Sequence, residues 1–268
     1  MRINRLILVV SLIASLILSV SAMASQTGCP DHFANGIAPD FINQKLTAKS
    51  REICYSGFAL KHSGVTRTPL YAAEHLTRER MLQGKEMRRQ SKFHPDENIP
   101  RSERAELHHY AKSGYDRGHV APSADMFDVQ SQFECFTLAN MVPQVPENNR
   151  GPWEGIESAV RMMAKSKGDI YVVTGPIYQG SNIEQIGGAV MVPTKLFKAV
   201  YDPQRKEAGA YLIDNTADAQ PEKISITELE KITGISIFPS VEESVKSRLM
   251  RLPEPKSYKD RKRKGGRG

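Results

Sequence analysis

The sequence Asp116-Arg117-Gly118-His119, followed about thirty residues later by Asn149, Glu157 and Arg161, carries most of the chemical information in this chain. A histidine imidazole ordinarily titrates near ~6.5, so it can accept a proton at neutral pH. The glycine before it permits an unusual backbone angle or the close approach of another group. Such a base, a neutral oxygen ligand, a carboxylate and an arginine can together cut a phosphodiester bond with a hydrated divalent cation.

A helix is predicted from residue 152 to 167, because Pro152 suits the first helical position and Gly168 is a stop signal. Apolar side chains recur between them at helical spacing, namely Trp153, Ile156, Val160 and Met163. Glu157 and Arg161 are four residues apart and share another face, and Asn149 lies just ahead of the predicted start. By themselves, these three residues favour a structural explanation, an N-terminal cap with a surface ion pair.

Strands and helices do not alternate regularly in the remaining sequence, so the predicted fold class is α+β. The segments predicted to form the sheet are 68–76, 136–142, 170–174, 189–192, 195–201 and 210–213. Residues 81–113 are polar and charged and predict a long loop that is functional or mobile. Capping-box patterns predict two short helices near the end of the domain, at Thr227/Glu230 and Ser240/Glu243.

Residues 1–24 have the features of a secretory signal peptide: a basic start, an apolar run from Leu6 to Val20, and Ala22-Met23-Ala24 at the cleavage site. The run is shorter than the ~20 residues of a membrane-spanning helix. We therefore expect cleavage after Ala24 and an exported protein, periplasmic or extracellular, with one domain at 25–255 and a basic, disordered tail at 256–268.

Export changes the interpretation of the three cysteines. Cys29 and Cys54 could close a loop of about 25 residues, and in an oxidising compartment such a bridge would contribute ~3 kcal/mol. Cys135 lies in a largely apolar run with no adjoining base, which predicts a buried thiol and not a nucleophile.

The net charge of +7 is concentrated at the two ends of the chain. Arg2 and Arg5 belong to the signal peptide, and the tail from Lys256 has seven cationic residues against Asp260, which leaves about −1 for residues 25–255. Global charge therefore does not attract this domain to nucleic acid. Phosphate would have to be held by a local groove or by the tail, for which a solubilising role is an equal alternative.

Three segments resemble the DNA/RNA non-specific endonucleases of the ββα-metal (His-Me finger) superfamily in order and spacing. They are Asp116–His119, Asn140-Met141-Val142-Pro143-Gln144, and Asn149 to Glu157 with Arg161. The resemblance covers about residues 70–239. It implies a central, mainly antiparallel sheet flanked by helices, with the active site in a ββα-metal motif. The implied function is cleavage of DNA and RNA, bound through backbone phosphates, with little sequence preference.

The resemblance also implies roles for individual residues. His119 would be the general base that activates water, Asn149 the one direct protein ligand of Mg²⁺, and Glu157 would hold the metal-bound waters. Mn²⁺ or another divalent cation could replace Mg²⁺. Three arginines would offset charge on the phosphate: Arg161, Arg117 and Arg89, with Arg88 as the alternative to Arg89.

Asp116 would support the metal–water cluster or its loop, and Asn140 would orient the site, although each has an equal, purely structural explanation. Two other classes of function stay open. One is a secreted nucleic-acid-binding protein without cleavage, against which the intact set of His119, Asn149 and Glu157 argues. The other is a small-molecule phosphodiesterase or phosphatase, which an occluded cleft would indicate.

Overall fold

The structure, a computed structural model, describes residues 27–87 and 92–256. A seven-stranded sheet forms its centre, with the strand order β12-β11-β10-β7-β4-β3-β2 and every neighbouring pair antiparallel. The α+β class and the mainly antiparallel sheet are therefore confirmed. The strands are β2 Ser50–Cys54, β3 Ala59–Ser63, β4 Thr68–Thr77, β7 Asp169–Ile177, β10 Lys195–Asp202, β11 Glu207–Asp214 and β12 Glu222–Ile224.

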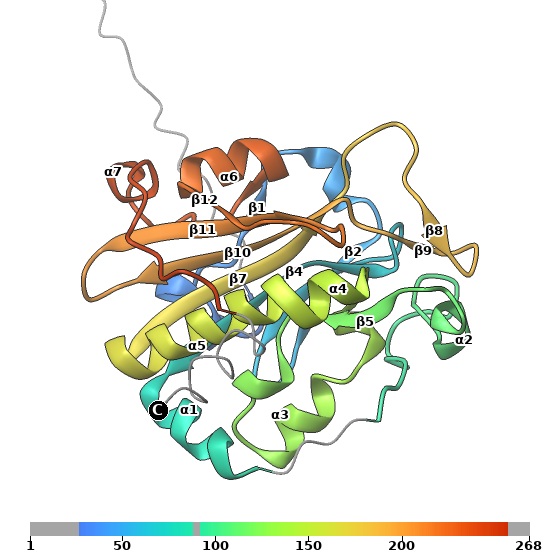
Figure 1. The fold of residues 1–268 in the computed structure, drawn as a ribbon, viewed down its shortest axis with the longest axis horizontal. Helices are drawn as coiled ribbons and strands as arrows, with labels where there is room; N and C mark the ends of the chain where they lie inside the picture. The colour runs from blue at the N-terminus through green and yellow to red at the C-terminus, as the bar shows by residue number, and fades with distance from the viewer. Residues whose placement is uncertain (1–26, 88–91, 257–268) are drawn as a thin grey trace, which may run out of the picture.

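Helices cover both faces of this sheet (Figure 1). One face packs against α5 (Glu154–Lys167), and the other packs against α6 (Ile226–Thr233) and α7 (Glu243–Lys246). Side chains alternate across each strand, so Ala72 lies in the core under α5 and Ala73 in the core under α6. Three small antiparallel pairs lie outside the sheet: β1 (Asp40–Phe41) with β13 (Ile235–Ser236), β8 (Gln185–Ile186) with β9 (Val190–Met191), and β5 (Asp116–His119) with β6 (Met141–Gln144).

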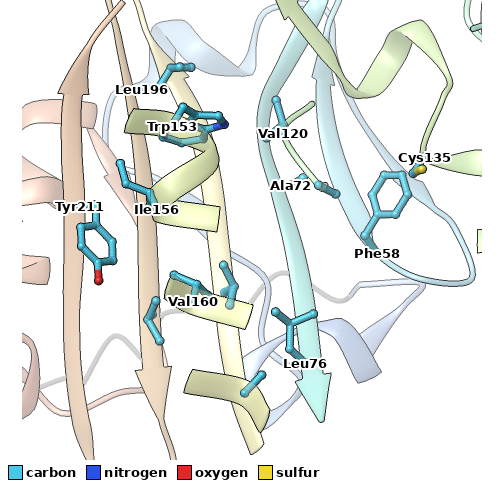
Figure 2. Close-up of a cluster of buried hydrophobic side chains, with 14 of the residues drawn as sticks. Phe58, Ala72, Leu76, Val120, Cys135, Trp153, Ile156, Val160, Leu196 and Tyr211 are labelled. Atoms are coloured by element: carbon cyan, nitrogen blue, oxygen red, sulfur yellow. The ribbon is translucent and has the colours of Figure 1, made fainter. Parts of the chain in front are cut away.

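The apolar stripe predicted around residue 156 anchors α5 on the sheet. Trp153, Ile156 and Val160 are at most 1% exposed and pack toward strand residues that include Leu76 and Leu196 (Figure 2). Burial of each side chain of this size contributes about 1.5–3 kcal/mol. The opposite, polar face of α5 is therefore held in a fixed position relative to the sheet.

The chain between β4 and β7 forms α5 and the elements that lie in front of its polar face. Because β4 pairs with β7, with Ala72 opposite Thr174, this long connection begins and ends side by side. Its described elements are α1 Arg78–Gln83, η4 Gly84–Glu86, α2 Leu107–Tyr110, β5 Asp116–His119, η5 Ser123–Asp125, α3 Val129–Glu134, η6 Leu138–Asn140, β6 Met141–Gln144, α4 Pro146–Asn148, η7 Asn149–Trp153 and α5.

The helix starts earlier than predicted. Pro146, not Pro152, occupies the first helical position, and α4, η7 and α5 form one helical run that is kinked at Gly151, where the backbone is not helical. Pro152 has no N–H to donate, and η7 is a wide π-helical turn with Gly151 at φ −122° and ψ −108°. Asn149 is consequently inside the run and not a cap ahead of it. Gly168 ends the run with φ 93°, as predicted.

Other predicted boundaries also shift for local reasons. Residues 138–140 form a turn whose Ala139 N–H donates to Thr137 Oγ1 at 3.3 Å, so the predicted 136–142 strand begins only at Met141 and continues through Pro143. Thr77 caps α1, which therefore occupies the start of the predicted loop. Residues 190–191 pair in the separate β8–β9 hairpin instead of extending the sheet.

The two C-terminal helices are present, but their predicted caps are wrong. Ser225 and Glu228 form the capping box of α6, and α7 follows Glu242. Glu230 instead forms a buried ion pair with Lys246 at 2.9 Å. The Glu230 side chain, which the capping pattern assigned to a helix end, therefore makes a tertiary contact instead.

Near the start of the described chain, three short helical turns precede β2, namely η1 Pro30–His32, η2 Ala34–Gly36 and η3 Gln44–Thr47. Cys29 and Cys54 form a disulfide, and Cys135 is a buried thiol that donates to the Gln132 carbonyl at 3.1 Å, both as predicted. Within residues 27–87 and 92–256, no helix is long and apolar enough to cross a membrane.

Candidate active site

A cleft of about 820 Å³ lies between the polar face of α5, the strand β5 and the chain that follows β4. It brings together six of the eight predicted site residues, Asp116, Arg117, His119, Asn149, Glu157 and Arg161. Of the remaining two, Asn140 does not line the cleft. Arg89 lies outside the described residues, as do the alternative Arg88, the predicted signal peptide and the tail beyond Lys256.

His119 reaches the cleft from the end of a two-stranded ribbon. β5 pairs with β6, which places His119 opposite Met141 and Gly118 opposite Val142. A Cβ on Gly118 would lie 2.2 Å from Gln144 Oε1 and 2.8 Å from Gln144 Cβ, so the glycine is required for close approach and not for an unusual backbone angle. Phe136 meets the His119 ring edge-on, with centroids 4.8 Å apart, and fixes its orientation.

Arg117 is the second β5 side chain in the cleft. Its guanidinium carbon lies 4.9 Å from the centroid of the Phe93 ring and 5.8 Å from that of Tyr110. Cation–π attraction therefore holds the positive group against an aromatic wall. No carboxylate within the described residues forms an ion pair with Arg117, which leaves its charge available to an anion in the cleft.

Asp116 connects β5 to the helical run. Its Oδ2 accepts a hydrogen bond from Asn149 Nδ2 at 2.9 Å, and Arg150 donates to both of its oxygens, at 2.8 and 2.5 Å. Because the nitrogen of the Asn149 amide is committed to Asp116, the amide oxygen is the atom left to serve as a ligand. Asp116 thus orients Asn149, and its own carboxylate is already occupied by two donors.

Glu157 and Arg161 face the cleft one helical turn apart. Burial raises the pKa of Glu157 to about 7, against the opposing effect of Lys198 and Arg161. Arg161 lies 3.2 Å through Nε from Asp125, a carboxylate with 0% side-chain exposure, and its own side chain is only 15% exposed. The expectation of a surface ion pair between Glu157 and Arg161 is therefore wrong, since the partner of Arg161 is a buried aspartate on η5.

Asn140 supports the site from behind. It is fully buried, its Nδ2 donates to the carbonyls of Ala121 and Cys135 at 2.9 Å each, and its Oδ1 accepts from the Ala121 N–H at 2.9 Å. Ala121 follows His119 by two residues. The amide of Asn140 therefore fixes the chain just beyond the histidine, which is an orienting role without contact with the cleft.

Several cleft residues escaped the sequence analysis. Glu154 and Lys165 extend the polar stripe of Glu157 and Arg161 along α5, and this spacing of three and four residues is a signal that the sequence contained. Lys85 and Arg150 add exposed positive charge at the cleft. Asp125 is buried and does not line the cleft, and the sequence contained no signal for it, because its pairing with Arg161 joins distant parts of the chain.

The donor set fits a cation that keeps most of its water. Two of the oxygen ligands in the cleft are the Asn149 amide oxygen and the Glu157 carboxylate, and the carboxylate receives no hydrogen bond from the described residues. A cluster of three acidic, histidine or cysteine ligands occurs in the described chain only at Cys29, Glu52 and Cys54, where the cysteines form the disulfide. Mg²⁺ binds through one or two protein oxygens and retains its other waters.

A β-ribbon that leads into a helix, with a histidine on its first strand and an asparagine at the start of the helical run, is the arrangement of a ββα-metal nuclease. The family model of the DNA/RNA non-specific endonucleases matches residues 38–244. The chain therefore belongs to the DNA/RNA non-specific endonuclease family.

Named relatives agree with this assignment. The chain is 34% identical over 242 residues to the mitochondrial nuclease EXOG of Xenopus laevis, covering 79% of this chain and 67% of that protein. It is 35% identical to the mitochondrial nuclease 1 of Schizosaccharomyces pombe, covering 69% of this chain and 65% of that protein, and it spans 63% of the EXOG of Danio rerio. A solved EndoG/EndoGI complex matches with a TM-score of 0.67 and 28% identity, over 74% of this chain and 89% of that one.

Proposed function

We propose that this protein is an exported, Mg²⁺-dependent endonuclease that hydrolyses DNA and RNA with little sequence preference. One observation carries the proposal: a single cleft holds His119, the oriented amide of Asn149, and the carboxylate of Glu157. Exposed cations at the cleft, Lys85 and Arg150, support a polymeric substrate over a small molecule enclosed in an occluded pocket.

In this proposal His119 takes a proton from a water molecule whose oxygen attacks the phosphorus. The bond from phosphorus to the 3′ oxygen breaks, the 3′ oxygen takes up a proton from a water molecule to become a hydroxyl, and the product keeps a 5′-phosphate. Arg117 and Arg161 offset the negative charge that builds on the phosphate oxygens. Mg²⁺ bound at Asn149 would supply charge stabilisation for the leaving oxygen. Glu157 would accept hydrogen bonds from the waters around that cation.

Low sequence specificity is expected from the groups that line the cleft. Arg117, Arg161, Lys85 and Lys165 are suited to phosphate oxygens, which carry no direct information about the bases. The attraction is local, because residues 25–255 have a net charge of about −1. The proposal that the tail after Lys256 adds phosphate contacts is separate and predicts stronger salt dependence when the tail is present.

The disulfide between Cys29 and Cys54 supports export, because structural disulfides persist mainly in oxidising compartments. The mitochondrial names of several relatives describe those proteins. For this chain we retain a signal peptide at 1–24, a nuclease domain at 25–255 and a basic tail at 256–268 as parts of the proposal.

The test is cleavage of a plasmid and of an RNA by the mature protein in Mg²⁺ or in EDTA, beside His119→Ala. General-base removal should lower the rate by roughly 10²–10⁴-fold. His108→Ala is the matched control, since His108 is exposed and does not line the cleft. Wild-type cutting that continues unchanged in EDTA or in His119→Ala would refute the mechanism, and binding without cutting would favour the nucleic-acid-binding alternative.

A further inference from the structure

Two buried asparagines join the chain around Asn149 to the end of the central sheet. Asn215 directly follows β11 and is 7% exposed, and Asn148 precedes Asn149 in α4 and is fully buried. Asn148 Nδ2 donates a hydrogen bond to the carbonyl of Asp214, the last residue of β11, at 2.7 Å. We call Asn148 and Asn215 the asparagine clasp, because they connect the end of β11 with the start of the helical run.

The side chain of Asn215 holds the corner between β6 and α4. Its Oδ1 accepts a hydrogen bond from the Val145 N–H at 2.9 Å, and its Nδ2 donates to the carbonyl of Pro143 at 3.1 Å. The same Nδ2 donates to the carbonyl of Pro193 at 3.0 Å, so both donors of the amide are used. Asn215 therefore bonds to the chain on both sides of Gln144, where the strand ends and the helical run is about to begin.

Asn215 is itself held in place by the sheet. Its backbone N–H donates to the Thr194 carbonyl at 2.9 Å, and the Thr194 N–H donates to the Ile177 carbonyl at 2.9 Å. Lys195 pairs with both Ile177 and Asp214, so β7 and β11 end here and β10 begins here. The corner is thus fixed to three strands of the central sheet.

The contacts of Asn215 reach Asn149 through a single residue. The carbonyl of Val145 accepts a hydrogen bond from the Asn149 N–H at 2.9 Å, while the Val145 N–H donates to Asn215. Asn148 adds a second connection, because it is the residue next to Asn149. The asparagine clasp therefore fixes the backbone of Asn149, whereas Asp116 orients its side-chain amide.

Packing of α5 on the sheet does not by itself fix Asn149. The backbone is not helical at Gly151, and Pro152 has no N–H to donate, so a kink separates Asn149 from the packed part of α5. On the other side of the kink, α4 has only three residues, Pro146–Asn148, and a helix this short is not stable alone. The position of Asn149 therefore depends on contacts outside the helical run.

We propose that Asn148 and Asn215 are positioning residues, which hold the backbone of Asn149 so that its amide oxygen is presented to the cation in the cleft. This inference rests on the proposed function, because it takes Asn149 as the ligand of the cation. The cleft cations Arg161 on α5 and Lys85 on η4 have no contact with the clasp. The effect of the clasp should therefore fall on metal binding and not on the binding of phosphate.

The test compares Asn148→Ala and Asn215→Ala with the wild type. The Mg²⁺ affinity of the folded protein, measured by calorimetry at pH 7, should fall about tenfold in each variant, the lower end of the loss typical for residues that orient metal ligands. The Kd for a DNA duplex in EDTA, measured by fluorescence anisotropy, should stay within about twofold, because the phosphate contacts remain. In the metal-free protein, the backbone N–H of Asn149 should exchange with deuterium about tenfold faster, as measured by NMR.

Ser225→Ala is the matched control for a general loss of stability. Ser225 is a buried residue whose Oγ accepts a hydrogen bond from the Glu228 N–H at 3.2 Å, and it caps α6 on the opposite face of the sheet. This variant should lower the unfolding temperature without a change in Mg²⁺ affinity or in the exchange of the Asn149 N–H.

Asn215→Ala loses three side-chain hydrogen bonds, so Asn148→Ala, which loses one, decides the test if the former does not fold. The inference is overturned if folded Asn148→Ala binds Mg²⁺ like the wild type, since the clasp would then only support the fold. An equal loss of Mg²⁺ affinity in Ser225→Ala would also overturn it, because the effect would not belong to this corner.

The failure of the proposed function has a different signature. If the wild type neither binds Mg²⁺ nor cuts, Asn149 is not a cation ligand and the proposed function fails. Exchange of the Asn149 N–H in the metal-free variants still shows in that case whether the clasp holds this residue, and unchanged exchange would overturn the inference separately.

Discussion

Glu157 and Arg161 are one turn apart on α5, yet their surroundings differ. Arg161 has a buried partner in Asp125, whereas Glu157 depends on the charges of Lys198 and Arg161 to offset its burial. The carboxylate is therefore the less stable of the two charges before a cation binds. This imbalance is what a cation site requires, because a carboxylate already satisfied by protein donors has little to gain from a hydrated metal.

Because the pKa of Glu157 is raised, the free energy of unfolding of the metal-free protein should depend on pH. The ordinary value is 4.5 and the folded value is about 7, so the folded protein holds this proton more strongly. Stability of the metal-free protein should be full below about pH 4.5 and should fall as pH rises through 7. We expect a loss of about 1–3 kcal/mol, measured by urea unfolding in EDTA at pH 5 and pH 8.

Glu157→Gln provides the comparison, because a glutamine does not titrate. The variant should lose less stability than the wild type over the same range. Equal losses in the two proteins would show that other groups, such as Glu74, account for the whole effect.

For individual residues, the sequence correctly predicted a place in the site for those that share a short motif or a helix face. His119, Asn149, Glu157 and Arg161 all reach the cleft. Glu74 was visible only as one acid within an apolar strand, and its position 3.8 Å from Lys198 depends on how three strands align. Such long-range register is not encoded in local spacing, which is why this buried ion pair could not be predicted.

Among the elements, the connection between β5 and the helical run decides the geometry of the cleft. Asp116 receives hydrogen bonds from Asn149 and from Arg150, so one carboxylate joins the strand to η7. The sequence predicted a helix here but placed its start at Pro152. A proline is tolerated here because the backbone is kinked at Gly151, the residue before it, and Asn149 lies beside β5 through its hydrogen bond to Asp116.

Asp116→Ala should release Asn149 and weaken Mg²⁺ binding. We expect the Mg²⁺ concentration for half-maximal cleavage to rise about tenfold, the effect reported for partners that orient metal ligands. Arg150→Ala is the control, because Arg150 is 71% exposed and its ion pair should contribute less than about 1 kcal/mol. A Mg²⁺ requirement that is unchanged in Asp116→Ala, or equally changed in both variants, would contradict the orienting role.

For the molecule as a whole, the sequence predicted the α+β class from the irregular order of its strands and helices, and the disulfide from two cysteines and an expected export signal. It could not give the strand order, in which β4 and β7 are neighbours although the whole site lies between them in the chain. Loops and turns set where each element begins, and tertiary contacts moved several of those boundaries.

The disulfide should stabilise the fold without affecting the chemistry. Cys29 and Cys54 lie at the β2 edge of the sheet and do not line the cleft. Cys29→Ser/Cys54→Ser should lower the free energy of unfolding by about 2–4 kcal/mol and leave the cleavage rate of the folded protein unchanged at 25 °C. Thermal unfolding and initial rates measure the two effects.

Cys135→Ala tests whether the free thiol contributes. A reducing agent should lower the stability of this variant as much as it lowers that of the wild type, because the disulfide is present in both. Loss of the cleavage rate in the folded double serine variant would mean that the bridge shapes the cleft.

The pairing of β4 with β7 has a consequence for how the enzyme forms. The two strands are separated by 91 residues (78–168), and this segment holds every described side chain of the cleft. Contacts between residues so distant in sequence generally form slowly, whereas a ribbon such as β5–β6 can form within its own segment. A newly made chain would therefore contain the histidine motif well before pairing of β4 with β7 closes the sheet behind it. The site is therefore complete only after β7 has been synthesised and has paired with β4.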